Sequence, residues 1–196
     1  MALIEVAPTD IATVVTVLEM RSKPSLRPLP RSPFRVVSWH RPSVEKYRVL
    51  FQRVGARWLW YSRLAMDDIA LRAAIDRPET QVHAVIDRAG IEVGLLEFTH
   101  PEGDWCALDY FALVPELAGQ QHGRWLMNLA LAMMWRPGVK MVRVNTCTLD
   151  HPSALNFYLA QGFVAISRTV EVFPDPRLIG LLPRDAAPHV PLLAAS

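Results

Sequence analysis

The order of short apolar segments in the second half of the chain is the feature that most constrains its fold. Three segments of strand-like composition follow one another across short turns that contain glycine, which is the pattern of an antiparallel meander. Helical and strand-like segments then alternate. In order, the pattern predicts strands over 81–86, 91–99 and 106–114, a helix over 124–135, a strand over 139–147, a helix from 150 to 162 and a strand over 163–172. This order predicts an α+β fold, with a mixed, mostly antiparallel sheet of about six to seven strands and helices on both faces.

The sequence before residue 81 predicts fewer helices and strands. Residues 11–20 are rich in β-branched side chains and favour a strand, which we interpret as appended to the main domain. A short strand over 34–39 precedes a helix over 44–54, for which Ser43 is a suitable N-cap. A second helix is expected over 66–76, where a proline follows it.

Prolines gather near both ends of the chain. Four of the 16 prolines fall within residues 24–33 and five within 174–191, and such clusters favour extended connectors. We therefore divide the chain into an N-terminal appended strand with a proline-rich connector (1–32), a main domain (33–173) and a proline-rich C-terminal tail (174–196).

Composition and charge argue against several classes of protein. With 196 residues, 51% of them hydrophobic, the chain can bury one sizeable core; a net charge of +2 without a basic run predicts no nucleic acid or membrane partner. The purest apolar stretch, 125–135, is well short of the roughly 20 residues that span a bilayer. Acidic residues and no Lys or Arg near the start do not fit a secretory signal, so we expect a cytoplasmic protein. Two cysteines and six dispersed histidines predict no metal site.

The loop from Glu116 to Gly123 is the sharpest sign of a ligand site. Gly119 and Gly123 lie where the third strand of the meander leads into an apolar helix, so bare N–H groups and the positive end of the helix dipole meet there. Such a junction binds phosphate groups, although a glycine-relaxed turn that only brings the helix close to the strand would have the same sequence. No GxGxxG, GKS or GKT motif occurs in this loop, which argues against dinucleotide-binding and P-loop folds.

Two motifs resemble the GNAT acyltransferase superfamily. The segment LVPELAGQQHGRWLM (113–127) is similar to the family's strand, Pro-Glu turn and pyrophosphate loop. The segment HPSALNFYLAQGF (151–163) is similar to its Ala-x-x-Phe-Tyr-x-x-x-Gly-Phe helix and following strand, and the order and separation of the two motifs also match. The resemblance implies a sheet that splays near its middle, acetyl-CoA as cosubstrate with no metal, and an N-acetyltransferase that moves the acetyl group directly to a primary amine.

The resemblance also assigns residues to the binding of acetyl-CoA. The backbone of Leu113 and Val114 would pair with the pantetheine arm in the manner of an added strand. The pyrophosphate would lie against the loop and the start of the next helix, at Ala118, Gly119, Gln120, Gln121, His122, Gly123 and Arg124. The family usually has Arg or Gln at the position of Ala118 and Gly at that of Gln121, so a positive φ angle at Gln121 would be mildly strained.

Three acidic groups are candidates for catalysis. In the family, the tyrosine at the position of Tyr158 protonates the departing CoA thiolate, and a phenol of pKa about 10 can do so when it is well positioned. A base must also take a proton from the amine. Glu97 and Asp109 each lie on an otherwise apolar strand face, where a raised pKa would suit a base, but a structural ion pair with an Arg would look the same. The sequence does not choose between them, and His83 and His100 are weaker alternatives.

The acceptor is a small-molecule or peptide amine that the sequence does not identify. Trp58, Trp60 and Tyr61 either line its pocket or belong to the core, and His151 flanks a helix. The alternatives to catalysis are a non-catalytic acyl-CoA-binding sensor and an interaction protein that keeps the GNAT fold. Residues 11–20 would leave an exposed sheet edge if unpaired, so a homodimer that covers this edge is plausible.

Overall fold

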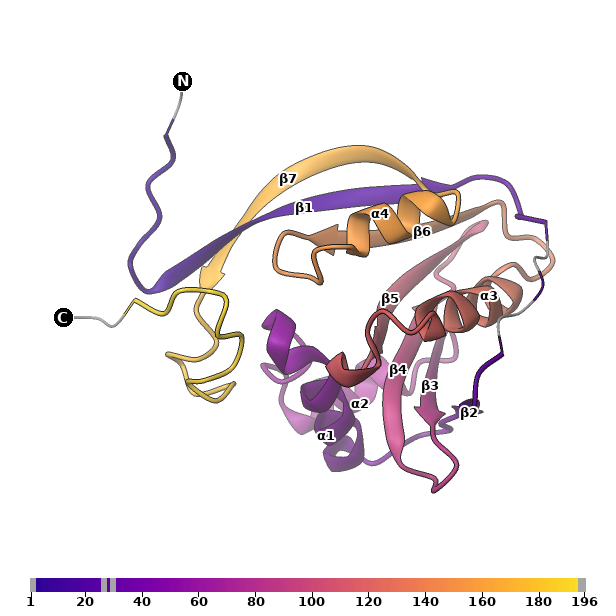
Figure 1. Cartoon of the computed structure of the whole chain (residues 1–196), viewed down its shortest axis with the longest axis horizontal. Coiled ribbons are helices and arrows are strands. Elements are labelled where there is room, and N and C mark those ends of the chain that lie inside the picture. Colours follow the sequence, from indigo (N-terminus) through magenta and orange to yellow (C-terminus); the bar gives the residue numbers. More distant parts are fainter. Residues whose placement is uncertain (1–2, 26–27, 29–30, 194–196) are drawn as a thin grey trace.

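One open sheet forms the centre of the protein (Figure 1). The computed structural model describes residues 3–25, 28 and 31–193, so part of the predicted connector, 26–27 and 29–30, lies outside the described residues. The strands are β1 (Asp10–Met20), β2 (Arg35–Ser38), β3 (Thr80–Ile86), β4 (Glu92–Thr99), β5 (Trp105–Leu113), β6 (Met141–Cys147) and β7 (Val164–Pro174). The helices are α1 (Val44–Gly55), α2 (Asp68–Ile75), α3 (His122–Met134) and α4 (Ala154–Ala160), with short 3-10 helices η1 (Ala56–Trp58) and η2 (Pro115–Leu117).

The sheet is mixed and mostly antiparallel, as the sequence predicts. Within the described residues it has seven strands in the order β2-β3-β4-β5-β6-β1-β7. The meander of β3, β4 and β5 is confirmed, and of the strand pairs described only β5 with β6 is parallel. A parallel pair needs a crossover, and α3 supplies it between β5 and β6.

The strand over residues 10–20 is an interior strand of the sheet. β1 pairs antiparallel with β6 along one side and with β7 along the other, and its buried Leu18 and Met20 join the main core. The exposed edge that residues 11–20 would leave if unpaired is therefore absent, because β7 covers it. The edge strand at this end is β7, and a homodimer stays a prediction without the support of an unpaired β1.

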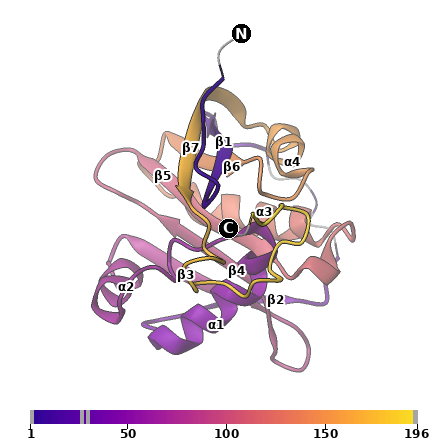
Figure 2. The ribbon, with the colours of Figure 1, turned by 90° about the vertical axis from the view of Figure 1, so that its left-hand side faces the viewer.

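Helices cover both faces of the sheet (Figure 2). Tyr47 of α1 donates a hydrogen bond to Glu97 of β4, and Glu97 lies opposite Tyr110 in β5. Phe111, the next residue of β5, stacks on Phe157 of α4 with ring centroids 5.8 Å apart. Because successive side chains of a strand point to opposite faces, α1 and α4 lie on opposite sides of the sheet.

Local sequence explains where the two early helices begin. The Ser43 hydroxyl accepts a hydrogen bond from the Lys46 N–H at 3.2 Å, and the Asp67 carboxylate accepts one from the Ala70 N–H at 2.7 Å. Each cap satisfies an N–H group that the first turn of a helix leaves without a partner. The helix expected over 44–54 is thus found at α1, and the one expected over 66–76 is found as the shorter α2.

The proline-rich C-terminal residues fold back on the domain, which corrects our expectation of an extended connector. Leu182 and Ala187 are buried in a second apolar cluster with Ile11, Leu59 and Phe173. The cluster joins the last turns of the chain to the start of β1, to the segment after η1 and to the end of β7.

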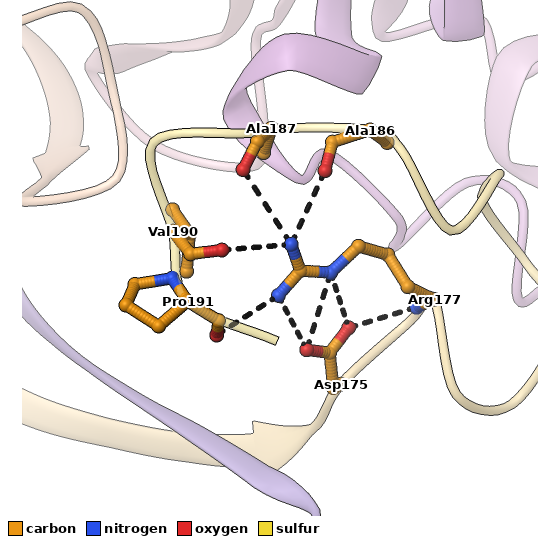
Figure 3. Close-up of polar contacts among 6 residues, drawn as sticks. All are labelled: Asp175, Arg177, Ala186, Ala187, Val190 and Pro191. Atoms are coloured by element: carbon orange, nitrogen blue, oxygen red, sulfur yellow. Dashed lines mark hydrogen bonds and ion pairs between the residues drawn. The ribbon is translucent and has the colours of Figure 1, made fainter. Parts of the chain in front are cut away.

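A buried guanidinium organises these turns (Figure 3). Arg177 pairs with Asp175, with 2.7 Å between Nη2 and Oδ2, and both side chains are almost fully buried. The same guanidinium donates hydrogen bonds to main-chain oxygens of four residues, namely Ala186, Ala187, Val190 and Pro191. Proline content alone predicted extension, but the carbonyl groups of these turns find a donor in Arg177.

Candidate functional site

The parallel strands β5 and β6 separate halfway along their length. They pair from Trp105 with Met141 to Leu108 with Val144, and beyond these residues β5 stays with β4 while β6 stays with β1. The sheet is therefore split near its middle, as the resemblance implies. Past the split, no described strand pairs with the edge of β5 that faces β6, so main-chain groups of this edge can bind a ligand.

A β-bulge marks the start of the split. Phe98 of β4 lies opposite Leu108, and Glu97 lies opposite Tyr110, so Asp109 is the extra residue of β5. A bulge bends its strand and redirects a side chain, and bulges are common beside active sites. Asp109 is therefore placed at the mouth of the split by backbone geometry that the alternation of the sequence does not reveal.

A cavity of about 450 Å³, here called the larger cavity, opens at the split. It is lined by residues of both sequence motifs, together with Asp109, Tyr158 and the aromatic residues Trp58 and Trp60. Of the residues predicted to bind acetyl-CoA, those that line it are Leu113, Val114, Ala118, Gly119, Gln121, Gly123 and Arg124. The structure thus brings two motifs that are distant in sequence to one cavity.

The N-terminus of α3 offers free N–H groups to this cavity. Gln121 is the N-cap residue, its φ angle is +64°, and no side chain of the described residues caps the helix. Gly119 has a φ angle of +77°, and a Cβ atom there would meet nothing within 4 Å. Arg124 adds a positive charge in the first turn, so the junction suits an anionic group such as a phosphate.

Two of the predicted loop residues do not line the larger cavity. The His122 ring lies edge-on to Phe34, with centroids 4.8 Å apart, and its Nδ1 is 3.4 Å from the Ser32 hydroxyl. The Gln120 amide donates to the main-chain oxygen of Glu116 at 3.0 Å. These side chains stabilise the connector and the loop, and the cavity is lined without them.

Tyr158 is buried on α4 with only 8% of its surface exposed. Its ring packs edge-on against Phe111, Phe157 and Phe163, and no described residue forms a hydrogen bond with its hydroxyl group. Burial raises the pKa of Tyr158 well above its usual value, and the negative charge of Asp150 adds to the shift. The phenol therefore holds its proton at neutral pH, which is the state that a proton donor needs.

The two candidate bases have different surroundings. Glu97 is fully buried, accepts a hydrogen bond from the Tyr47 hydroxyl at 2.5 Å and forms an ion pair with Arg63. Burial raises the pKa of Glu97, while Arg63 and Tyr47 oppose the shift. Glu97 lines neither cavity at the split. Its pair with Arg63 is the structural ion pair that the sequence left open as an alternative to a catalytic role.

Asp109 is the carboxylate that reaches the open space. It lines the larger cavity and also a second one of about 350 Å³, here called the smaller cavity. It accepts one hydrogen bond, from the Thr99 hydroxyl at 2.6 Å. Desolvation by the surrounding protein raises the pKa of Asp109, while Thr99 partly offsets the shift. A carboxylate with a raised pKa at the meeting point of two cavities is suited to accept a proton.

Sequence reasoning did not find several residues of the two cavities. Asn145 follows Val144, the last residue of β6 that pairs with β5, and lines both cavities. Asp150 accepts hydrogen bonds from the Thr146 hydroxyl at 2.7 Å and from the Trp60 indole at 3.3 Å, and so ties the early chain to the region before α4. The signal for Asn145 was a polar residue inside a strand, whereas nothing local pointed to the contact of Asp150 with Trp60.

The remaining candidates from the sequence lie in different places. Trp58 and His151 line the larger cavity with their rings 5.4 Å apart, whereas Tyr61 stacks on Phe173 outside both cavities. His83 and His100 are buried, burial lowers the pKa of both, and neither lines a cavity at the split.

Two further searches covered the part of the chain that the structure describes. No cluster of three or more His, Cys, Asp or Glu side chains there could hold a metal ion. No helix there is both long enough and apolar enough to cross a membrane.

Comparison with known proteins identifies the family. The model of the Acetyltransferase (GNAT) family matches residues 38–163, a stretch that includes both motifs, the split and all the residues that line the two cavities. The chain belongs to the GNAT acetyltransferase family, whose members carry out acyl-CoA-dependent acetyl transfer. No curated protein matches the sequence.

Solved structures share the fold at low sequence identity. A GCN5-related N-acetyltransferase from Sphaerobacter thermophilus has a TM-score of 0.60 at 12% identity, over 83% of this chain and 51% of that one. A tandem GNAT protein from the clavulanic acid biosynthesis pathway has a TM-score of 0.55 at 17% identity, over 84% and 53%. An acetyltransferase from Thermus thermophilus has a TM-score of 0.53 at 16% identity, over 73% and 97%. The chain thus spans only about half the length of the first two.

Proposed function

We propose that this protein transfers an acetyl group from acetyl-CoA directly to a primary amine. The observation that carries the proposal is the split between β5 and β6, where the carboxylate of Asp109 and the phenol of Tyr158 line one cavity with the start of α3. A thioester is already activated, so the protein has to supply position, proton transfer and stabilisation of charge.

The residues of the larger cavity fit acetyl-CoA. The free N–H groups at the start of α3, together with Gly119 and Arg124, would hold the pyrophosphate. The unpaired edge of β5 up to Leu113 and Val114 would bind the pantetheine arm through main-chain hydrogen bonds. A main-chain N–H of the same edge would polarise the thioester carbonyl as negative charge develops on its oxygen.

The proton steps divide between the two side chains. A primary amine is mostly protonated at neutral pH, and Asp109, directly or through one water, would remove that proton. The amine nitrogen then forms a bond to the acetyl carbon while the bond from carbon to sulfur breaks. Tyr158 would give its proton to the sulfur, and the proton that the nitrogen loses as the amide forms restores the phenol through solvent.

Isothermal titration with acetyl-CoA and with CoA is the first test, followed by release of free CoA thiol in the presence of a broad panel of amines. We expect both ligands to bind and at least one amine to be acetylated. Tyr158→Phe should bind acetyl-CoA as the wild type does but lose turnover, and Tyr61→Phe, which changes a tyrosine outside both cavities, is the matched control.

The outcomes separate the proposal from its alternatives. Binding of CoA without acetylation of any amine would contradict the enzymatic function and favour an acyl-CoA sensor. No binding of either ligand at millimolar concentration would contradict both and leave an interaction protein that keeps the GNAT fold.

A further inference from the structure

The smaller cavity carries two guanidinium groups that the proposed acetyl transfer does not use. Besides Asp109 and Asn145, it is lined by Arg63, Arg143 and Trp105. It meets the larger cavity at the split, where Leu108, Asp109, Tyr110, Val144 and Asn145 line both. A second substrate in the smaller cavity would therefore reach Asp109 from the side away from the pyrophosphate loop.

The guanidinium group of Arg143 is held in a fixed orientation, and not all of its N–H donors are used. Its Nη2 and Nε both donate to one oxygen of Glu19 in the neighbouring strand β1, at 2.7 and 3.3 Å, and Glu19 is almost fully buried. The guanidinium also lies over the Trp105 ring, 5.2 Å from its centroid, and the side chain is 40% exposed. No described residue bonds to Nη1, so one side of the planar group is available to a ligand.

Arg63 is also fixed, and it has few oxygen partners. Its Nη2 pairs with Glu97 behind it, and its plane lies over the Tyr110 ring, 5.3 Å from the centroid. Among the described residues, its Nη1 contacts only the sulfur of Met66 at 3.7 Å, and its buried Nε has no partner. Guanidinium donors in a protein normally find oxygen acceptors, so this group is under-satisfied.

The charges of the smaller cavity complement a molecule that carries both signs. Asp109 lies at the split, where an ammonium group is needed, and the two arginines line the same small volume. We infer that the acceptor is an amine that also carries an anionic group, such as a free amino acid, with its ammonium at Asp109 and its carboxylate at Arg143 and Arg63. A polycation such as a polyamine would place charge against two guanidinium groups, which is unfavourable. This inference rests on the proposed function.

Matched pairs of acceptors test the inference directly. Acetyl-CoA-dependent thiol release is measured with the standard amino acids, with the corresponding amino acid amides and with spermidine. We expect kcat/KM to be about ten- to hundred-fold higher for the preferred amino acid than for its amide, since the amide lacks a charge-assisted hydrogen bond. Equal values within every pair, or the highest value for spermidine, would overturn the inference while the proposed function stands.

A double variant shows whether Arg143 causes the preference. Glu19→Gln with Arg143→Gln removes both charges and keeps groups of similar size, so no buried charge is left unpaired. KM for the amino acid should rise about tenfold or more, while KM for its amide and for acetyl-CoA stays within about twofold. Lys140→Gln, an exposed change near the start of the same strand, is the control. An unchanged preference in the double variant would contradict the role of Arg143.

A binding measurement keeps this test independent of turnover. Thermal shift of the protein with N-acetyl amino acids and with their N-acetyl amides requires no acetyl-CoA. If no amine is acetylated but the free acids stabilise the wild type and not the double variant, the proposed function fails and the anion site stands. If neither set of compounds stabilises the wild type and no amine is acetylated, both fail.

Discussion

The two cavities that meet at the split are built in different ways. The larger cavity is lined mostly by consecutive residues at the end of β5, in the following loop and at the start of α4, and its proposed anion site is made of main-chain N–H groups. The smaller cavity is lined by charged side chains from distant parts of the chain, namely Arg63, Asp109 and Arg143. The first can be encoded by a short motif, whereas the second depends on partners brought together by the sheet.

This difference explains why the sequence alone points to an acetyl-CoA site but does not identify the acceptor amine. A loop that binds with its backbone needs glycine and a helix start at fixed spacing, so its sequence is constrained wherever the fold occurs. In a pocket that binds through side chains, different residues can occupy the same positions when the acceptor differs, provided that the charged residues paired with them differ too. Glu97 and Glu19 are such supports here, since each holds an arginine of the smaller cavity.

The largest expected effect is that of Tyr158→Phe on the chemical step. Loss of a general acid lowers kcat by about 10² to 10⁴, which corresponds to about 3–5 kcal/mol. KM for acetyl-CoA should stay within about threefold, because no other contact of the ring changes. Steady-state kinetics at saturating acetyl-CoA check this prediction. A variant with wild-type kcat would remove Tyr158 from the mechanism.

Glu97→Gln should act on stability first. The change leaves the Arg63 guanidinium without its charged partner in a buried site, and breaking a buried ion pair in this way costs about 3–5 kcal/mol. Urea denaturation of the wild type and the variant measures the free energy of unfolding. The exposed Glu102→Gln is the control, with an expected change within about 0.5 kcal/mol. If Glu97→Gln kept full stability and lost turnover, Glu97 would be the base instead of Asp109.

Asp109→Asn should act on activity and on its pH dependence. The base must be ionised to accept a proton, so the wild-type rate falls as pH drops through the pKa of Asp109. Because desolvation by the surrounding protein raises this pKa, the fall occurs at a higher pH than for an ordinary carboxyl group. We expect the variant to lose about 10² in kcat/KM at neutral pH, and less at alkaline pH where more of the amine is already deprotonated. The profile of kcat/KM against pH tests this, and an unchanged acid limb in the variant would contradict the assignment.

The sequence predicted most of the fold because most of its signals are local. Ser43 as a cap and the glycine-containing turns of the meander fix elements from a few adjacent residues, and the structure has them. The place of β1 depends on which distant strands accept it, and β-branched residues suit an edge or an interior strand equally. The turns held by Arg177 likewise need acceptors up to 14 residues away.

The candidate site divides in the same way. The two motifs predicted a loop with glycines that leads into a helix, and the structure has this junction, with a φ angle of +64° at Gln121. That the junction binds an anion stays a prediction. The distinction between Glu97 and Asp109 depended on a bulge in β5 and on an arginine 34 residues before Glu97. Neither feature can be predicted from the alternation of apolar and polar residues along one strand. Roles for Tyr158 and Asp109 stay predictions until the variants are measured.

The smallest expected effect lies in the loop of the larger cavity. Gln121 has a φ angle of +64°, where any residue with a Cβ atom is less favourable than glycine by about 1 kcal/mol. Gln121→Gly should therefore raise the free energy of unfolding by about 0.5–1 kcal/mol and tighten acetyl-CoA binding by about two- to fivefold, as a side chain leaves the cavity lining. Urea denaturation and isothermal titration measure the two effects.

Gln120→Gly is the matched control for this loop, because the neighbouring residue has an ordinary φ angle and a side chain outside the cavity. Here the glycine only adds freedom to the unfolded chain and removes the hydrogen bond to Glu116, so stability should fall by about 0.5–1 kcal/mol. If the two glycine variants change the free energy of unfolding in opposite directions, the backbone at Gln121 is strained in its positive φ angle. If both variants lower the free energy of unfolding, the strain is absent and Gln121 does not destabilise the loop.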